Sequence, residues 1–225
     1  MKISVIVPVL NEEKTVASAL QAAARLAPFE IIVVDGGSSD RTADICRQHR
    51  VKLLTAPRGR ARQMNAGARE ARGEVLLFLH ADTRLPDTAL EDVERALGAP
   101  RFLAGRFDVR LDGKHWMLKL VGAMINHRSR CSKVATGDQA IFVRREVFEQ
   151  IGGYPDIPLM EDIALCRMLK RKGAMACLKS RVLTSARRWE SEGVWRTILR
   201  MWALKLLYLA GVPPARLRRY YADAR

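Results

Sequence analysis

The stretch FLHADT, residues 78–83, closes the apolar run VLLFL, and the fold of the chain is decided at this junction. The run, residues 75–79, is typical of a strand that is buried on both faces. It ends at His80 and Asp82, and the small Ala81 between them would face away, so that both polar side chains can point the same way. In open α/β sheets, ligands bind beyond the carboxyl ends of the strands. The pair suits a divalent metal with a diphosphate, or direct contact with a sugar nucleotide; the alternative is an ordinary strand end with an Asp helix cap.

Strands and helices alternate along the chain before this junction. The segments 3–9, 30–34 and 51–55 are rich in Val, Ile and Leu and are predicted to be strands. Helices are predicted between them, the first from residues 11–13 to about residue 26, the second to about 49 and the third, after the basic segment 58–62, through 71. This alternation predicts an α/β fold with a mostly parallel central sheet that is covered by helices on both faces.

Beyond the junction, the pattern is less regular. It predicts a helix over 86–97, strands over 102–111 and 140–144, a helix over 146–151 and a further helix that starts at 161. The apolar segment 116–125 is followed by residues 126–130, NHRSR, which are interpreted as a polar basic loop with His127 exposed.

Asp35 follows the second predicted strand directly and is itself followed by Gly36 and Gly37. Adjacent glycines let a ligand approach the backbone closely, and the carboxylate can accept a hydrogen bond from a base N–H or a ribose hydroxyl. The glycine spacing is not that of a dinucleotide fingerprint. A polar turn capped by the Asp is the alternative interpretation.

Basic side chains precede the third predicted helix. Arg58, Arg60 and Arg62 alternate there, and Asn65 follows within the helix. Guanidinium groups at a helix N-terminus favour phosphate binding, whereas a solvated basic face is the alternative.

The adjacent acids Glu161 and Asp162 stand at the start of a predicted helix. They could cap the helix dipole, or one of them could act as a general base near a phosphate-binding site.

The net charge of +15 over 225 residues predicts an anionic partner, such as a nucleotide, anionic lipid or nucleic acid. The four cysteines have no paired spacing, which favours reduced thiols, and the N-terminal apolar run is too short for a signal peptide. The protein is therefore expected in the cytoplasm. The basic residues are dispersed and form no nucleic-acid motif, so no nucleic acid is expected as a partner.

The C-terminal segment 193–211 is apolar but contains Arg196, Arg200 and Lys205, which argues against a membrane-spanning helix. Two interpretations stay open: a basic, Trp-containing helix at an anionic membrane surface, or a helix packed on the catalytic domain or on a second subunit of a homo-oligomer. The presence of two apolar segments, 116–125 and 193–211, also points to a lipid-linked acceptor.

Five stretches taken together resemble the family 2 glycosyltransferases of the GT-A fold: SVIVPVLNEEKTV, EIIVVDGGSSDRT, GRARQMNAGAREARGEVLLFLHADT, GDQAIFVRREVFEQIGGY and MEDIAL. A narrower resemblance is to small bacterial members found beside radical-enzyme and arsenosugar gene clusters. The resemblance implies a catalytic domain over residues 1–190, with a nucleotide-binding half of about 1–83 and an acceptor half of about 84–190, and a helical appendage over 191–225.

The resemblance also implies roles for single residues. Asp162 is similar to the catalytic base, with Glu161 as the next candidate, and Asp82 matches the last acid of the metal-binding DXD motif. The nucleotide-sugar site is implied to include Pro8, Asn11 and Glu13 of the first loop, Asp35 as the acid that reads the base, Asp138 of the acceptor-side Gly-Asp segment, and Arg188 and Trp189 of a degenerate basic-aromatic motif.

One departure concerns the metal. His80 stands where the family has the first acid of its motif, and imidazole suits Mn²⁺ better than Mg²⁺. One divalent ion, Mn²⁺ or Mg²⁺, is still expected at Asp82 and His80, with the arginines sharing the neutralisation of the diphosphate.

The expected function is therefore that of an inverting glycosyltransferase, with a UDP-sugar as the expected donor and an unidentified acceptor. A degenerate domain that binds a nucleotide sugar without transfer is the alternative, and a basic nucleic-acid-binding protein ranks last.

Overall fold

The computed structural model describes residues 1–221. Its strands are β1 (Ile3–Val9), β2 (Glu30–Asp35), β3 (Lys52–Thr55), β4 (Val75–Phe78), β5 (Thr83–Arg84), β6 (Phe102–Asp112), β7 (Phe142–Arg144) and β8 (Ala174–Ser185). Its α-helices are α1 (Val16–Arg25), α2 (Thr42–Arg47), α3 (Arg60–Glu70), α4 (Ala89–Gly98), α5 (Trp116–Ser132), α6 (Arg145–Gln150), α7 (Glu161–Lys172), α8 (Arg187–Glu192), α9 (Val194–Leu209) and α10 (Pro214–Leu217). Two short 3₁₀ helices cover Gly137–Gln139 and Arg218–Tyr220.

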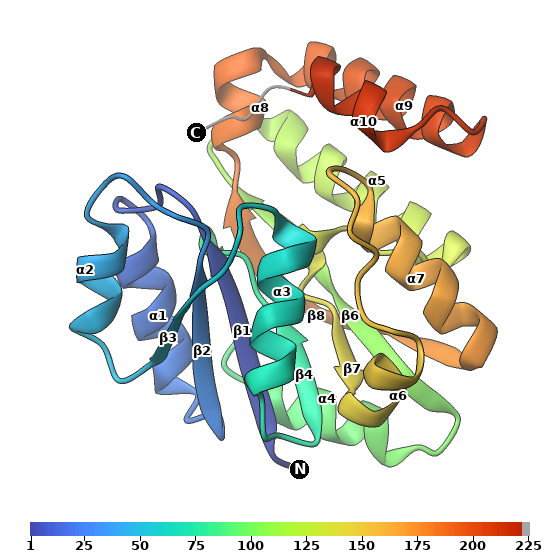
Figure 1. The fold of residues 1–225 in the computed structure, drawn as a ribbon. Coiled ribbons are helices and arrows are strands. Elements are labelled where there is room, and N and C mark those ends of the chain that lie inside the picture. Colours follow the sequence, from blue (N-terminus) through green and yellow to red (C-terminus); the bar gives the residue numbers. More distant parts are fainter. Residues whose placement is uncertain (222–225) are drawn as a thin grey trace.

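The strands form one mixed sheet in the order β3-β2-β1-β4-β7-β6-β8-β5 (Figure 1). Strands β1, β2, β3 and β4 pair in parallel, as do β6 and β8, while β7 runs antiparallel to its neighbours β4 and β6. The predicted α/β class with a mostly parallel sheet is confirmed.

The register of the parallel strands places the candidate ligand-binding residues on one edge. Val9 of β1 pairs with Asp35 of β2, and Ile6 of β1 pairs with Phe78 of β4. The chain segments that follow β1, β2 and β4 therefore leave the sheet at the same carboxyl edge, as the alternation predicts.

Alternate side chains of the strands build a separate core on each face of the sheet. On one face, Val5 and Val33 pack with α1, α2 and α4. On the other face, Ile6 and Val34 pack with α3, α6 and α7. Figure 1 shows α3 crossing one face of the sheet with α1 and α2 behind it. Because both faces are covered, β1 and β4 consist almost wholly of apolar residues, and β2 has apolar residues between its two terminal acids.

The first helix begins later than predicted. Asn11 has a left-handed backbone conformation, with φ of 54°, and the chain makes a turn before α1 starts at Val16. The reason is that Asn11 turns toward the β2–α2 loop and bonds to it instead of capping the helix.

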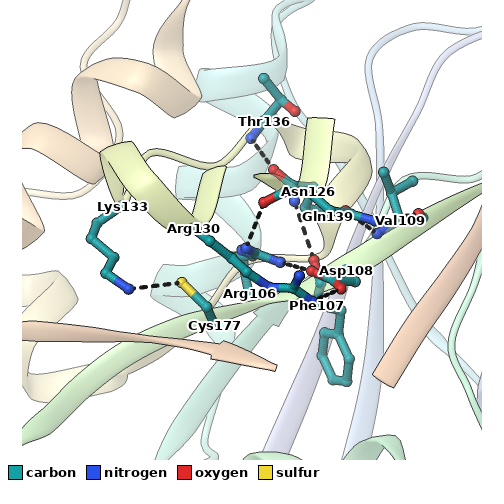
Figure 2. A network of polar contacts seen from close by, with 10 residues as sticks. All are labelled: Arg106, Phe107, Asp108, Val109, Asn126, Arg130, Lys133, Thr136, Gln139 and Cys177. Atoms are coloured by element: carbon teal, nitrogen blue, oxygen red, sulfur yellow. Dashed lines mark hydrogen bonds and ion pairs between the residues drawn. The ribbon is translucent and has the colours of Figure 1, made fainter. Parts of the chain in front are cut away.

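The predicted loop over residues 126–130 is wrong, because α5 continues without a break to Ser132. Its polar residues are used against the sheet (Figure 2). The Asn126 amide accepts from the Val109 N–H at 2.8 Å and donates to the Val109 carbonyl at 2.9 Å. Arg130 of α5 and Arg106 of β6 both bind the buried carboxylate of Asp108. A helix that packs on a sheet usually does so through an apolar face. Here hydrogen bonds and ion pairs to β6 hold the last turns of α5 on the sheet instead.

Helices α8, α9 and α10 lie together with α5 beyond the carboxyl edge of the sheet (Figure 1). The apolar C-terminal segment is thus a helix beside the sheet edge, and no helix among residues 1–221 is long and apolar enough to cross a bilayer. Residues 222–225 of the predicted appendage lie outside the described residues.

Gly67 of α3 allows this helix to pack closely on the sheet, because a Cβ there would lie 2.5 Å from Cγ2 of Ile6. We expect Gly67→Ala to lower the free energy of unfolding by about 1–3 kcal/mol through overpacking. Denaturant unfolding measures the change. Gly98→Ala is the matched control, because it is also helical and a Cβ there meets nothing within 4 Å. Equal stability changes in the two variants would argue against the close packing.

Candidate functional site

A cavity of about 820 Å³ opens at the carboxyl edge of the sheet. Its polar wall comes from four chain segments, because the end of β4, the first turn of α3, the loop before β7 and the first turn of α7 meet there. The charged and polar residues from these segments are Arg60, His80, Asp82, Asp138, Glu161 and Asp162. Helices α5, α8 and α9 form the opposite wall.

Two adjacent acids are buried at the start of α7. Glu161 is 4% exposed and Asp162 is 8% exposed. The N–H of Gly137 donates to Oδ2 of Asp162 at 2.8 Å, whereas Oδ1 is buried and has no hydrogen-bond donor among the described residues. Arg60 Nη1 lies 4.0 Å from Glu161 Oε1. One carboxylate oxygen of Asp162 is thus held in place, and the other accepts no hydrogen bond from the described residues.

The environment of Asp162 raises its pKa well above the ordinary value of an aspartic acid. Burial is the largest cause, and the negative charge of Glu161 adds to it, while Arg60 and the Gly137 N–H act in the opposite direction. A carboxylate with a raised pKa is a stronger base than one in water, and such shifts are common where acids and bases do chemistry.

Gly137 fills the space between His80 and Asp162. A Cβ at this position would lie 2.4 Å from Nε2 of His80 and 2.9 Å from Oδ2 of Asp162, so only glycine fits. The close approach brings the end of β4 against the start of α7. The two motifs that the sequence places 80 residues apart therefore form one site.

Asp82 and His80 both line the cavity, as expected of metal ligands. Within residues 1–221, however, no three His, Cys, Asp or Glu side chains are grouped so as to hold a metal ion. A carboxylate and an imidazole fit an ion that takes its other ligands from phosphate oxygens and water, as Mg²⁺ and Mn²⁺ do in nucleotide sites. The side chains present thus fit a metal only together with a diphosphate.

Asp35 is buried in the turn after β2. Its carboxylate accepts hydrogen bonds from the Gly37 N–H at 3.2 Å, from the Ser38 N–H at 3.1 Å and from the Ser38 hydroxyl. Gly36 lies over the side chain of Gln63, whose amide donates to the Val9 and Val34 carbonyls at 2.8 Å. Asp35, Gly36 and Gly37 form a rigid turn at the carboxyl edge, next to β1 but not in the cavity wall.

The first loop is joined to this turn. Oδ1 of Asn11 accepts from the Ser39 N–H at 2.9 Å, and the Glu13 carboxylate accepts from the Arg41 N–H at 3.4 Å. Pro8 lies half-buried near the end of β1. Asn11 and Glu13 thus hold two loops together, and it is Glu12 between them that lines the cavity.

The basic and polar residues at the start of α3 do not all lie at one phosphate-binding site, as the sequence predicts. Arg62 pairs with Asp156 at 2.9 Å, and Asn65 exchanges hydrogen bonds with the backbone of Tyr154. Both side chains face the 154–156 loop, Arg58 is exposed, and none of the three lines the cavity. Only Arg60 points into it, because residues two apart on a helix lie on different faces.

Arg188 and Trp189 of α8 line the cavity together with Arg187. The Arg188 guanidinium binds the Tyr221 hydroxyl and lies 4.3 Å from the centroid of the Tyr221 ring. Arg187 Nη2 lies 3.8 Å from Oε2 of Glu12. The basic-aromatic segment thus connects the C-terminal end of the described chain with the first loop.

Sequence reasoning missed several cavity residues, notably Arg128 of α5 and Trp202 and Lys205 of α9. Their segments were interpreted as a loop and as an appendage. The available signal was the presence of basic residues within or directly after apolar segments. Such residues indicate a helix that packs against the rest of the protein and directs its basic side chains into a site. Burial lowers the pKa of Arg128, and burial together with the charges of Arg128 and Arg167 lowers the pKa of Lys205 to about 8.

Comparisons with known proteins agree with this geometry. A sequence profile described as "Glycosyl transferase family 2" matches residues 4–152. The probable glycosyltransferase YdaM of Bacillus subtilis is 28% identical over 223 residues, which cover 85% of this chain and 51% of YdaM. The poly(ribitol-phosphate) beta-N-acetylglucosaminyltransferase TarS of Staphylococcus aureus is 34% identical over 103 residues, which cover 41% of this chain and 18% of TarS.

Solved structures share the fold. TarS 1–349 in complex with UDP-GlcNAc has a TM-score of 0.64 at 21% identity, and the match covers 82% of this chain and 58% of that structure. The glucosyl-3-phosphoglycerate synthase of Mycobacterium tuberculosis, in complex with Mg²⁺ and UDP, has a TM-score of 0.65 at 19% identity and covers 94% of this chain and 80% of that one. The chain spans about half the length of YdaM and less of TarS.

Asp162→Asn is expected to stabilise the protein at neutral pH, because it removes a buried negative charge and keeps an acceptor for the Gly137 N–H. The pKa is raised in the folded state, so the wild type loses stability as pH rises above the ordinary Asp value. We expect the variant to melt about 2–4 °C higher at pH 7.5, which is the shift that about 1 kcal/mol produces in a protein of this size, and the difference to vanish toward pH 4.

Thermal melts between pH 4 and pH 8 measure this difference. Asp156→Asn is the control, because its carboxylate is exposed and paired with Arg62. A melting difference for Asp162→Asn that does not change with pH would contradict the raised pKa.

Proposed function

The chain belongs to glycosyl transferase family 2, and from this premise we propose that it is an inverting glycosyltransferase that uses a UDP-sugar donor. A sugar is transferred from the nucleoside diphosphate to an acceptor hydroxyl in a single displacement. UDP is the proposed nucleotide because two structures with the same fold contain UDP or UDP-GlcNAc. The narrower likeness to the subgroup found with arsenosugar gene clusters is part of this proposal.

One observation carries the proposal: an acid with a raised pKa, a strand-end carboxylate and a guanidinium face the same cavity. These are Asp162, Asp82 and Arg60. Transfer from a diphosphate requires a base for the acceptor and positive charge for the leaving group, and the two must lie on opposite sides of the reacting carbon. A cavity with both kinds of group at its polar end supports such a reaction.

The donor is proposed to lie across the carboxyl edge of the sheet. Its base and ribose contact the rigid turn at Asp35, Gly36 and Gly37, beside the loop of Pro8, Asn11 and Glu13. Asp35 is 6% exposed and already accepts three hydrogen bonds, so it presents an oriented carboxylate to the nucleoside. The diphosphate then reaches Asp82, Arg60 and Arg188 in the cavity.

In the proposed reaction, the acceptor oxygen forms a bond to the anomeric carbon while the bond from that carbon to the diphosphate oxygen breaks. The electron pair leaves with the nucleoside diphosphate, and the acceptor proton passes to Asp162. The free Oδ1 of Asp162 is the proposed proton acceptor, because Oδ2 is held by the Gly137 N–H. Glu161 is the second candidate, and Nη1 of Arg60 lies 4.0 Å from its Oε1.

A divalent ion would be held by Asp82, with His80, and would supply positive charge for the leaving diphosphate. Arg60 and Arg188 contribute positive charge from this chain itself. Residues 1–83 form the proposed nucleotide-binding half and residues 84–190 the proposed acceptor half, with Asp138 on the acceptor side. The segment 191–225 is the proposed appendage.

Nucleoside diphosphates test the donor. We expect UDP to raise the melting temperature above that of the free protein, and CDP, GDP and dTDP to raise it less, since a ligand that binds only the folded state stabilises it. Each nucleotide is measured with and without Mn²⁺ or Mg²⁺. A UDP effect without any metal effect moves the neutralising role from Asp82 to the arginines. If no nucleotide shifts the melting temperature at millimolar concentration, the proposed donor class is wrong.

Asp162→Ala separates the transferase from a domain that only binds a nucleotide sugar. We expect the variant to lose transfer, or hydrolysis of UDP-sugar, by about 10²–10⁴-fold, the usual contribution of a general base. The UDP-induced melting shift should be unchanged, because Asp162 lies on the acceptor side of the reacting carbon in the proposed pose.

The release of UDP from a panel of UDP-sugars gives the rate, and Asp156→Ala is the matched control. A wild-type protein that binds UDP but turns over no faster than Asp162→Ala would support the degenerate domain instead.

A further inference from the structure

The cavity at the proposed acceptor side continues into an apolar groove between α5 and α9. Its walls are Val121 and Met124 on α5, and Ile198, Met201, Trp202 and Leu206 on α9. A sugar or a small polar alcohol makes no use of such walls, because burying a hydroxyl beside apolar side chains gains nothing. The groove therefore selects for an acceptor with an apolar part.

Exposed apolar side chains continue from the groove walls along the same two helices. Of the twelve large hydrophobic side chains that are exposed within residues 1–221, three lie on α5 and six on α9. On α9, Trp195, Leu199, Trp202 and Leu206 are spaced by three or four residues and share one face. Exposed apolar surface of this extent marks an interaction site.

Arg128 and Lys205, two cations of the groove, form no ion pair among the described residues. Nε and Nη2 of Arg128 are buried without a hydrogen-bond acceptor among the described residues, and Lys205 faces the same cavity from α9 with no ion pair there. Asp138 is the acid whose charge acts on Arg128. Burial, with repulsion by Arg128 and Arg167 added to it, lowers the pKa of Lys205 to about 8. An anion between the two cations would relieve this repulsion.

We propose that the groove binds a phospholipid whose head group carries the acceptor hydroxyl. The phosphate lies between Arg128 and Lys205, the acyl chains follow the apolar walls of α5 and α9, and the hydroxyl reaches Asp162. Asp138 lies next to Gly137, which binds Asp162, and its charge acts on Arg128, so the phosphate site and the proposed base are neighbours. This inference rests on the proposed function and names the class of its acceptor.

The positive charge near the exposed apolar face favours a lipid over a second copy of this chain as its binding partner. The chain carries a net charge of +15, and Arg196, Lys205 and Arg216 lie on or next to α9. Two copies that meet through this face would bring like charges together, whereas an anionic lipid surface attracts the basic residues.

Monomeric dihexanoyl-phosphatidylglycerol, kept below its micelle concentration, is the probe, because it carries the phosphate, hydroxyls and acyl chains without presenting a membrane surface. Binding is measured by calorimetry on the full chain. Since hydrogen bonds to charged groups contribute most to such a site, we expect Lys205→Gln to weaken binding by about tenfold or more. Trp202→Gln, which removes an apolar wall, is expected to have a comparable effect.

Two matched controls lie on the same helix. Arg196→Gln and Trp195→Gln change an exposed cation and an exposed Trp that do not line the cavity, and both should bind the probe like the wild type. Equal losses in the controls, or no binding by the wild type, overturn the proposal. So does a concentration-dependent dimer, measured by light scattering, that dissociates in Trp202→Gln and Trp195→Gln alike.

The UDP-induced melting shift separates this proposal from the function on which it rests. We expect Lys205→Gln and Trp202→Gln to keep the full shift. If Lys205→Gln loses it, the cations serve the donor diphosphate and the lipid assignment is wrong. If the wild type binds the probe but its melting temperature does not change with any nucleotide, the lipid-binding proposal is supported and the donor proposal is wrong.

Discussion

The burial of Asp162 beside Glu161 is the constraint on which the rest of the site depends. Two adjacent carboxylates in a nearly dry position are costly, because each loses its water and repels the other. They are tolerated since the N-terminus of α7, the Gly137 N–H and Arg60 surround them with positive potential. Each of these groups comes from a different segment. The acid pair therefore links α3, α7 and the loop before β7.

The same constraint explains the unusual backbone around the pair. Met160, which precedes Glu161, has a φ of 68°, in the left-handed region that side chains other than glycine rarely adopt. Gly137 has no room for a Cβ, because His80 and Asp162 approach it from two sides. Strain and close approach at neighbouring positions are typical of sites in which geometry is held for chemistry.

Helix α5 connects the core with the proposed acceptor side of the cavity. Its inner face is held on β6 by Asn126 and by the Asp108 carboxylate, which binds two arginines. A buried charge network of this kind contributes little net stability but is costly to break, so it fixes the helix in one position. The other face of α5 then forms one wall of the groove, opposite α9. A wall that is fixed in one position suits the proposed apolar acceptor site.

The sequence by itself determined the α/β fold and the position of polar residues at two strand ends. Apolar strands that alternate with helices permit few folds other than a parallel sheet with helices on both faces. In such a sheet, Asp35 and Asp82 come to the same edge whatever the order of the strands, because each stands at the carboxyl end of its strand. Only the tertiary structure decided which polar side chains share the cavity. Asn65 and Arg62 contact the 154–156 loop, while Arg60, Arg128 and Lys205 face the cavity, and residues 126–130 are helical because their polar groups find partners on β6. The local pattern of apolar residues predicts which side chains are buried by the hydrophobic effect. It cannot predict the burial of a polar side chain, because that burial depends on a hydrogen-bond or ion-pair partner far away in the sequence.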